Sequence, residues 1–150
     1  MELEGYKIKR EEGNFIYWFY SEGPKGKIIK TIQFQHMLEY GKDFFNLAFG
    51  DVDEHTGGLN DKPITNNGDY QKVLLTVAKV VLNFINFWPR AIIQVKGNTL
   101  SRTRLYQMGI GAFWLDISQE VDILGELNGD WVPFKKGVNY TGFLVFKKIR

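Results

Sequence analysis

The chain has 150 residues, a formal net charge of +2 and no cysteine. This length fits one domain and is enough to bury roughly two thirds of the unfolded surface, so the fold needs no disulfide or metal for stability. The lack of cysteine excludes disulfides, thiolate metal sites and cysteine nucleophiles. A charged N-terminal segment and the lack of any run of about twenty apolar residues argue against a secretory signal and a membrane span. We therefore expect a cytoplasmic protein with no membrane contact.

The first third of the chain predicts three β-strands, and a long helix follows them. Aromatic and alternating apolar residues mark the strands, and a segment rich in glycine and proline separates the first two. The helix begins near Asp69, carries apolar residues at a spacing of three and four, and ends before Pro89. The predicted strands are 15–20, 28–34 and 44–49.

The second half predicts a short apolar strand, a second helix and a final β-hairpin with one more strand. The second helix begins near Ser101, and we expect Gly109 and Gly111 to kink or break it. The Asn128–Gly129 pair is typical of a two-residue hairpin turn. The predicted strands are 91–95, 121–127, 131–134 and 140–146.

The resulting order, β-β-β-α-β-α-β-β, predicts a single α+β domain over residues 1–150. Its sheet is mixed, mostly antiparallel and twisted, with two main helices packed on it.

Basic and polar residues gather where the second helix begins. Cations are disfavoured at the positive end of a helix, so an anion bound there would explain two arginines in the first turns. A guanidinium group matches a phosphate or carboxylate with two hydrogen bonds. Alternatively, the arginines pair with surface carboxylates and Ser101 only caps the helix. The candidate ligand-binding residues are Lys96, Asn98, Thr99, Ser101, Arg102, Arg104 and Tyr106.

Helical spacing divides this candidate site. Arg102 and Tyr106 are four residues apart and share a helix face, whereas Arg104 points elsewhere. Both arginines can therefore bind the same ligand only if the first turn of this helix is distorted.

A second candidate anion site lies at the start of the first helix, at Asn66, Asn67 and Gly68. Its free amide groups would face the ligand, with an ordinary capped helix start as the alternative. The acidic segment 51–55 lacks the spacing of a calcium loop, and His36 and His55 belong to no catalytic motif. We predict no metal site, and the sequence leaves both catalytic residues and enzymatic activity undecided.

Four segments carry a resemblance to a family of short bacterial proteins of unknown function. They are SEGPKGKI, LAFGDVDEHTG, NNGDYQKVLLTVAKVV and GNTLSRTRLYQMGI. This resemblance implies a shared fold and no particular activity.

A second resemblance concerns the order of the elements, which is similar to the core of GNAT-type N-acetyltransferases. Asn98, Leu105, Tyr106, Gly109 and Ile110 resemble that superfamily's pattern, with a shorter Tyr–Gly spacing and Ile110 in place of an aromatic residue. This resemblance implies acetyl-CoA as a cofactor and places residues 64–69 where its pyrophosphate would bind.

Two functions follow from these residues. The first is a small domain that binds an anionic small molecule at residues 96–106, where Tyr106 is a hydrogen-bond donor or a general acid. The alternative is a nucleic-acid-binding or toxin–antitoxin-like interaction protein whose binding is steeply salt-dependent. In that alternative, the arginines are joined by Lys135, Lys136, Lys147, Lys148 and Arg150.

Overall fold

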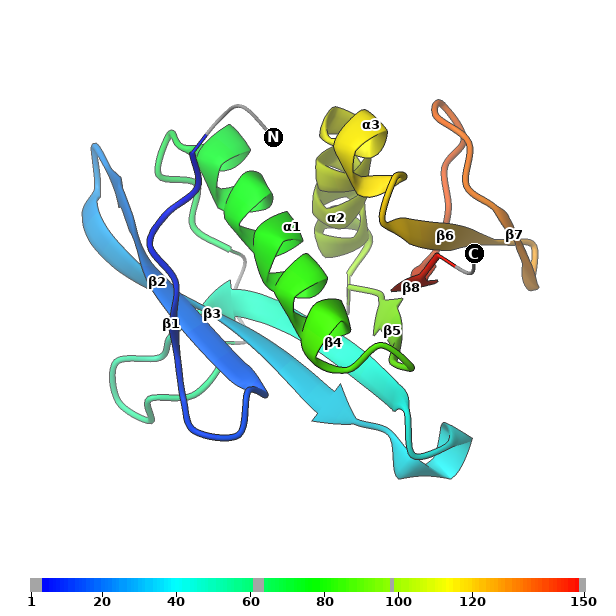
Figure 1. The fold of residues 1–150 in the computed structure, drawn as a ribbon. Helices are drawn as coiled ribbons and strands as arrows, with labels where there is room; N and C mark the ends of the chain where they lie inside the picture. Colours follow the sequence, from blue (N-terminus) through cyan, green and yellow to red (C-terminus); the bar gives the residue numbers. More distant parts are fainter. Residues whose placement is uncertain (1–3, 61–63, 98, 149–150) are drawn as a thin grey trace.

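The computed structural model describes residues 4–60, 64–97 and 99–148. Within these residues, eight strands form one open, strongly twisted sheet in the order β1-β2-β3-β4-β5-β8-β6-β7 (Figure 1). The strands are β1 (Lys9–Arg10), β2 (Ile16–Gly23), β3 (Gly26–His36), β4 (Phe44–Asp51), β5 (Ile92–Val95), β6 (Val121–Leu127), β7 (Asp130–Pro133) and β8 (Phe143–Lys147). The helices are α1 (Tyr70–Phe87), α2 (Leu100–Ala112) and α3 (Trp114–Ile117), with a 3-10 turn at Leu38–Tyr40.

Strand pairing makes the sheet mixed and mostly antiparallel, as the sequence predicts. The one parallel pair among the described strands is β4–β5, in register from Phe44 with Ile92 to Leu47 with Val95. Because a parallel pair needs a crossover, the chain runs through α1 between these two strands. The carboxyl ends of β4 and β5 therefore lie at the same edge of the fold, where α1 and α2 begin.

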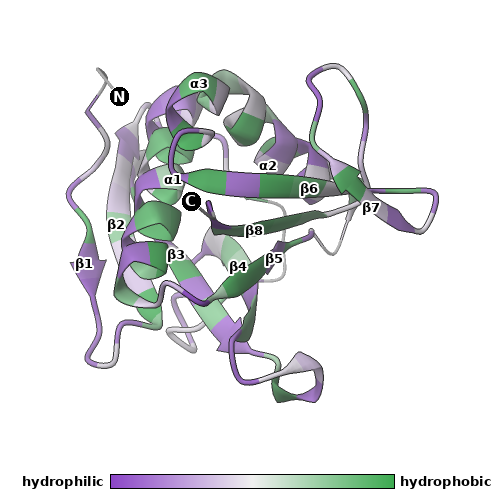
Figure 2. Ribbon diagram, turned by 45° about the vertical axis from the view of Figure 1, so that its right-hand side comes forward, coloured by the Kyte–Doolittle hydropathy of each residue, from purple (hydrophilic) through white to green (hydrophobic). Residues whose placement is uncertain are grey.

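The helices lie on one side of the sheet, and the core fills the space between them (Figure 1). Phe84 of α1 stacks on Phe34 of β3, with ring centroids 3.9 Å apart, and meets Phe45 of β4 edge-on. These three rings are almost fully buried. The strands β5 and β8 are mostly apolar (Figure 2), as expected for the centre of a sheet.

The sequence predicts most of these elements, with two differences. The short strand β1 and the one-turn helix α3 have no counterpart among the predicted elements. The strands β6, β7 and β8 match the predicted strands 121–127, 131–134 and 140–146, although the predicted order counts only two strands after the second helix. The hairpin turn is confirmed, because Asn128 and Gly129 both have positive φ angles, of 52° and 84°.

Gly109 and Gly111 do not break α2, which runs continuously to Ala112. Gly109 instead lies against α1, where an added Cβ atom would come within 3.3 Å of a Leu74 side-chain carbon. The glycine thus allows the two helices to approach closely. None of the helices in the described ranges combines the length and apolarity needed to cross a lipid bilayer.

Candidate anion site at the start of α2

A tight connection from β5 places the first turn of α2 at the carboxyl end of the central strands. Thr99 caps the helix, because its Oγ1 accepts a hydrogen bond from the Arg102 amide at 3.2 Å. Gly97 packs so closely on this turn that an added Cβ atom would lie 2.5 Å from the Arg102 Cβ atom. A glycine here therefore fixes where the helix starts. Asn98, a predicted ligand contact, lies outside the described residues.

Arg102 is buried, and its guanidinium group forms a hydrogen bond within the protein. Its residue is only 8% exposed, and its Nη2 donates a hydrogen bond to the Asn60 carbonyl at 3.2 Å. Asn60 belongs to the connection between β4 and α1, and its amide donates to the Asp51 carbonyl. Arg102 therefore connects α2 to the segment that follows β4. It also lines a surface hollow beside the first turns of α2.

Arg104 is exposed and lies between two surface hollows. One hollow, of about 400 Å³, separates the first turns of α2 from Ile64 and Tyr70. The other, of about 500 Å³, separates α2 from the loop after β7, where Lys136 and Asn139 line it. Arg104 and Met108 belong to both hollows.

The charge around Arg104 is uncompensated. Neither hollow is lined by a described Asp or Glu. In the described part of the chain, no carboxylate lies within ion-pair distance of Arg104 or Lys136, although Lys27, Lys30, Arg90 and Lys96 all have such partners. The two hollows therefore form a positively charged strip along the exposed side of α2.

Two other predicted contacts face away from this strip. Lys96 pairs with Glu126 of β6, with 3.3 Å between Nζ and Oε1. Tyr106 is buried on the inner face of α2, and this burial raises the pKa of its hydroxyl to about 12, against the opposing effect of the Arg102 charge. Among the described residues predicted at this site, the structure thus brings together Thr99, Ser101, Arg102 and Arg104, while Lys96 and Tyr106 lie elsewhere.

At the second candidate anion site, the polar groups bind one another. The Gly68 amide donates to Asn66 Oδ1 at 2.9 Å. The Asn67 side chain is almost fully buried, accepts from the Lys25 amide and donates to the Gly26 carbonyl, both at 2.8 Å. These bonds fasten the β2–β3 hairpin to the start of α1.

A buried ion pair lies beside this segment, and sequence reasoning missed it. Lys30 of β3 is only 1% exposed, and its Nζ lies 2.6 Å from Asp51 Oδ1 and 2.9 Å from the Thr65 carbonyl. Asp51 Oδ2 also accepts from the Thr65 amide. The only signal in the sequence is that Lys30 falls at an inward-facing position of an alternating strand.

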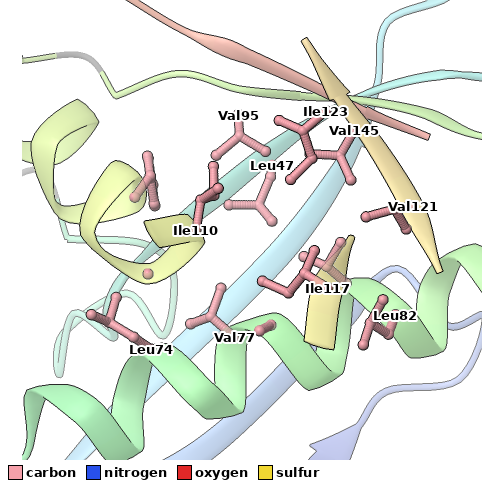
Figure 3. A pocket seen from close by; sticks show the side chains of 14 residues that line it. Leu47, Leu74, Val77, Leu82, Val95, Ile110, Ile117, Val121, Ile123 and Val145 are labelled. Atoms are coloured by element: carbon pink, nitrogen blue, oxygen red, sulfur yellow. The ribbon is translucent and has the colours of Figure 1, made fainter. Parts of the chain in front are cut away.

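An apolar pocket of about 70 Å³ lies on the inner side of α2, and the sequence analysis did not predict it. Val77 and Leu82 of α1 form one wall, and Ile110 of α2 and Val145 of β8 lie across from them (Figure 3). The Tyr106 side chain also lines it. The pocket is separate from both hollows, with no lining residue in common with either.

The lysines of the nucleic-acid alternative lie in two places. Lys135 and Lys136 follow β7, whereas Lys147 and Lys148 lie at the end of β8. The Lys148 Nζ donates to the Ser118 carbonyl at 2.7 Å. Arg150 lies outside the described residues. Within the described ranges, no group of three or more histidine and acidic side chains is placed to hold a metal ion.

Comparison with known proteins gives one match. A family of unknown function, DUF6934, matches residues 2–148, which is nearly the whole chain. No curated protein matches the sequence, and no solved structure matches the chain. The resemblance to GNAT-type N-acetyltransferases is therefore not confirmed.

Proposed function

Because the chain belongs to the DUF6934 family, whose function is unknown, we propose a function from the site alone. The protein binds a small molecule that bears a phosphate or carboxylate group, and Arg104 on the exposed side of α2 is its main contact. The observation that carries this proposal is the uncompensated charge of Arg104 between two hollows that no described carboxylate lines.

The residues around Arg104 suit an anion. The guanidinium group presents paired N–H donors that match two oxygens of a phosphate or carboxylate, and Lys136 adds a second cation across the hollow. Ser101 and Thr99 bring hydroxyl groups, and the first turn of a helix leaves amide groups without acceptors inside the helix. Arg102 supports this arrangement indirectly, since it fixes the first turn of α2 against the end of β4.

The proposal is for binding rather than for catalysis. Tyr106, the expected general acid, lies on the opposite side of α2 from Arg104 and is buried. Its side chain lines the apolar pocket on the inner side of α2, so its hydroxyl does not reach an anion bound at Arg104.

Thermal melting in the presence of sodium pyrophosphate, citrate and acetyl-CoA tests the proposal. A ligand present at a hundred times its dissociation constant stabilises the folded state by about 2.7 kcal/mol, which raises the melting temperature of a domain of this size by about 5–10 °C. We expect at least one of these anions to give such a rise. A rise with acetyl-CoA and none with pyrophosphate would identify coenzyme A as the ligand class.

Matched variants locate the site. Arg104→Ala should abolish the rise, whereas Arg90→Ala removes the same charge from another exposed arginine, outside the hollows, and should preserve it. An equal rise in both variants would refute the assignment of Arg104. Binding of a single-stranded RNA oligonucleotide that weakens steeply with salt, without any response to small anions, would favour the nucleic-acid alternative instead.

A further inference from the structure

The long helix α1 carries two apolar faces, and only one of them is fully covered. Val73, Val80 and Phe84 are buried against the sheet. A second stripe, formed by Val77, Ala78, Val81 and Leu82, is only partly buried. The close contact between Leu74 and Gly109 brings α2 onto α1 just before this stripe, and the pocket opens beyond that contact.

The pocket is a real gap in the packing. Protein interiors are normally packed as densely as organic crystals, with few voids larger than a water molecule. This one has about 70 Å³, and side chains from α1, α2, α3 and the sheet point into it (Figure 3). Because its lining is apolar apart from the Tyr106 residue, it offers water few of the two to four polar partners that a buried water needs.

We propose that this pocket binds a short aliphatic group of a small molecule, which enters beside Val81 and Leu82. The apolar lining excludes a charged or strongly polar group, because such a group would lose its hydration without gaining partners. The proposal does not rest on the anion site, since Arg104 lies on the outer side of α2 and the pocket on its inner side.

The volume of the pocket restricts the size of this group. A cavity of about 150 Å³ lined by aliphatic residues stays dry and binds benzene. The present pocket has less than half that volume, so an aromatic ring does not fit without rearrangement of its walls. A group of the size of a water molecule occupies roughly 30 Å³. The pocket therefore accommodates two or three carbon atoms.

Methyl NMR spectroscopy with gaseous probes tests this inference directly. With ¹³C-labelled valine, leucine and isoleucine methyl groups, the protein is titrated with xenon, propane and, separately, benzene. We expect saturable shifts for propane and xenon at Val81, Ile110 and Val145, and no saturable shift for benzene. The absence of saturable shifts at these methyl groups with propane would overturn the proposal, and benzene binding as tightly as propane would overturn the size limit.

Filling the pocket supplies the matched control. Ala78→Leu adds three carbon atoms to the lining and should weaken propane binding at least tenfold, while Ala112→Leu makes the same change on an exposed residue of α2 and should leave binding unchanged. If Ala78→Leu does not fold, Val81→Ile adds one methyl group to another lining residue and should weaken binding in the same direction. Unchanged propane affinity in a folded pocket variant would place the site elsewhere.

Discussion

The two long helices both begin at the carboxyl end of a central strand, but their polar surroundings differ. At the start of α1, Asp69 accepts hydrogen bonds from the Tyr6 hydroxyl at 2.6 Å and the Ser21 hydroxyl at 2.5 Å, and the neighbouring Asn67 is buried and fully engaged. At the start of α2, Arg104 has no carboxylate partner among the described residues. Polar groups that form hydrogen bonds within the protein stabilise the fold, whereas the Arg104 side chain, which has no carboxylate partner among the described residues, is available to a ligand.

The largest expected effect on the free energy of unfolding comes from a polar group that is paired within the protein. Asp51→Ala removes the partner of Lys30, which then stays buried with an uncompensated charge. Breaking a buried ion pair in this way costs about 3–5 kcal/mol. Urea denaturation should therefore show a loss of that size in the free energy of unfolding. A loss below about 1 kcal/mol would mean that Lys30 reaches water, as exposed pairs do.

Substitutions of the two arginines of α2 should differ in their effect on the free energy of unfolding in the same measurement. Arg102→Met leaves the Asn60 carbonyl without its buried donor, so we expect a loss of about 1–3 kcal/mol. Arg104→Met changes an exposed side chain and should stay within about 0.5 kcal/mol. Equal losses in the two variants would contradict the division of roles between them.

The free energy of unfolding at alkaline pH should depend on the burial of the Tyr106 hydroxyl. Its pKa is raised by burial from 10.0 to about 12 in the folded state, so the unfolded state loses its proton first as the pH rises. The stability that this tyrosine contributes is fully present below about pH 10 and is lost as the pH rises toward 12, at up to about 1.4 kcal/mol per pH unit. Tyr106→Phe should flatten the decline of unfolding free energy in that window, and an identical slope in both proteins would refute the burial of the hydroxyl.

A small effect is also expected for Glu126. The Thr141 hydroxyl and then the Lys96 ammonium lower the pKa of this carboxyl, so its contribution is present above about pH 4.5 and is lost as the pH falls through the lower folded-state value. Glu126→Gln should cost less than about 1 kcal/mol at neutral pH, because the pair is partly exposed. This cost should decrease as the pH is lowered below about 4.5 in acid-titrated urea curves, and a cost that does not decrease there would have another cause.

Local periodicity explains why much of this fold is predictable from the sequence. The alternation of β3, the three-and-four spacing of α1 and the Asn128–Gly129 turn each depend on residues close together in the chain. The divergence of Arg102 and Arg104 also follows from helix geometry alone, and the structure has the first buried and the second exposed.

Contacts between distant residues were not predictable in the same way. The partners of Lys30 and Arg102 lie 21 and 42 residues away, and no periodic pattern specifies them. The apolar pocket depends on how closely α2 approaches α1 at Gly109, which the sequence analysis interpreted as a break in the helix. The sequence predicts Lys136 only as part of a nucleic-acid surface, since its position across from Arg104 depends on the tertiary fold.

The two edges of the open sheet have a consequence for how copies of this chain behave at high concentration. An unpaired edge strand is a template for strand addition and aggregation unless it is short, charged or interrupted by proline. One edge, β1, consists of Lys9 and Arg10 alone and is hydrophilic (Figure 2), and the other, β7, has four residues and ends at Pro133. Both edges thus resist further pairing, so replacing Lys9 and Arg10 with valine should promote fibre formation in a light-scattering assay before it changes the melting temperature.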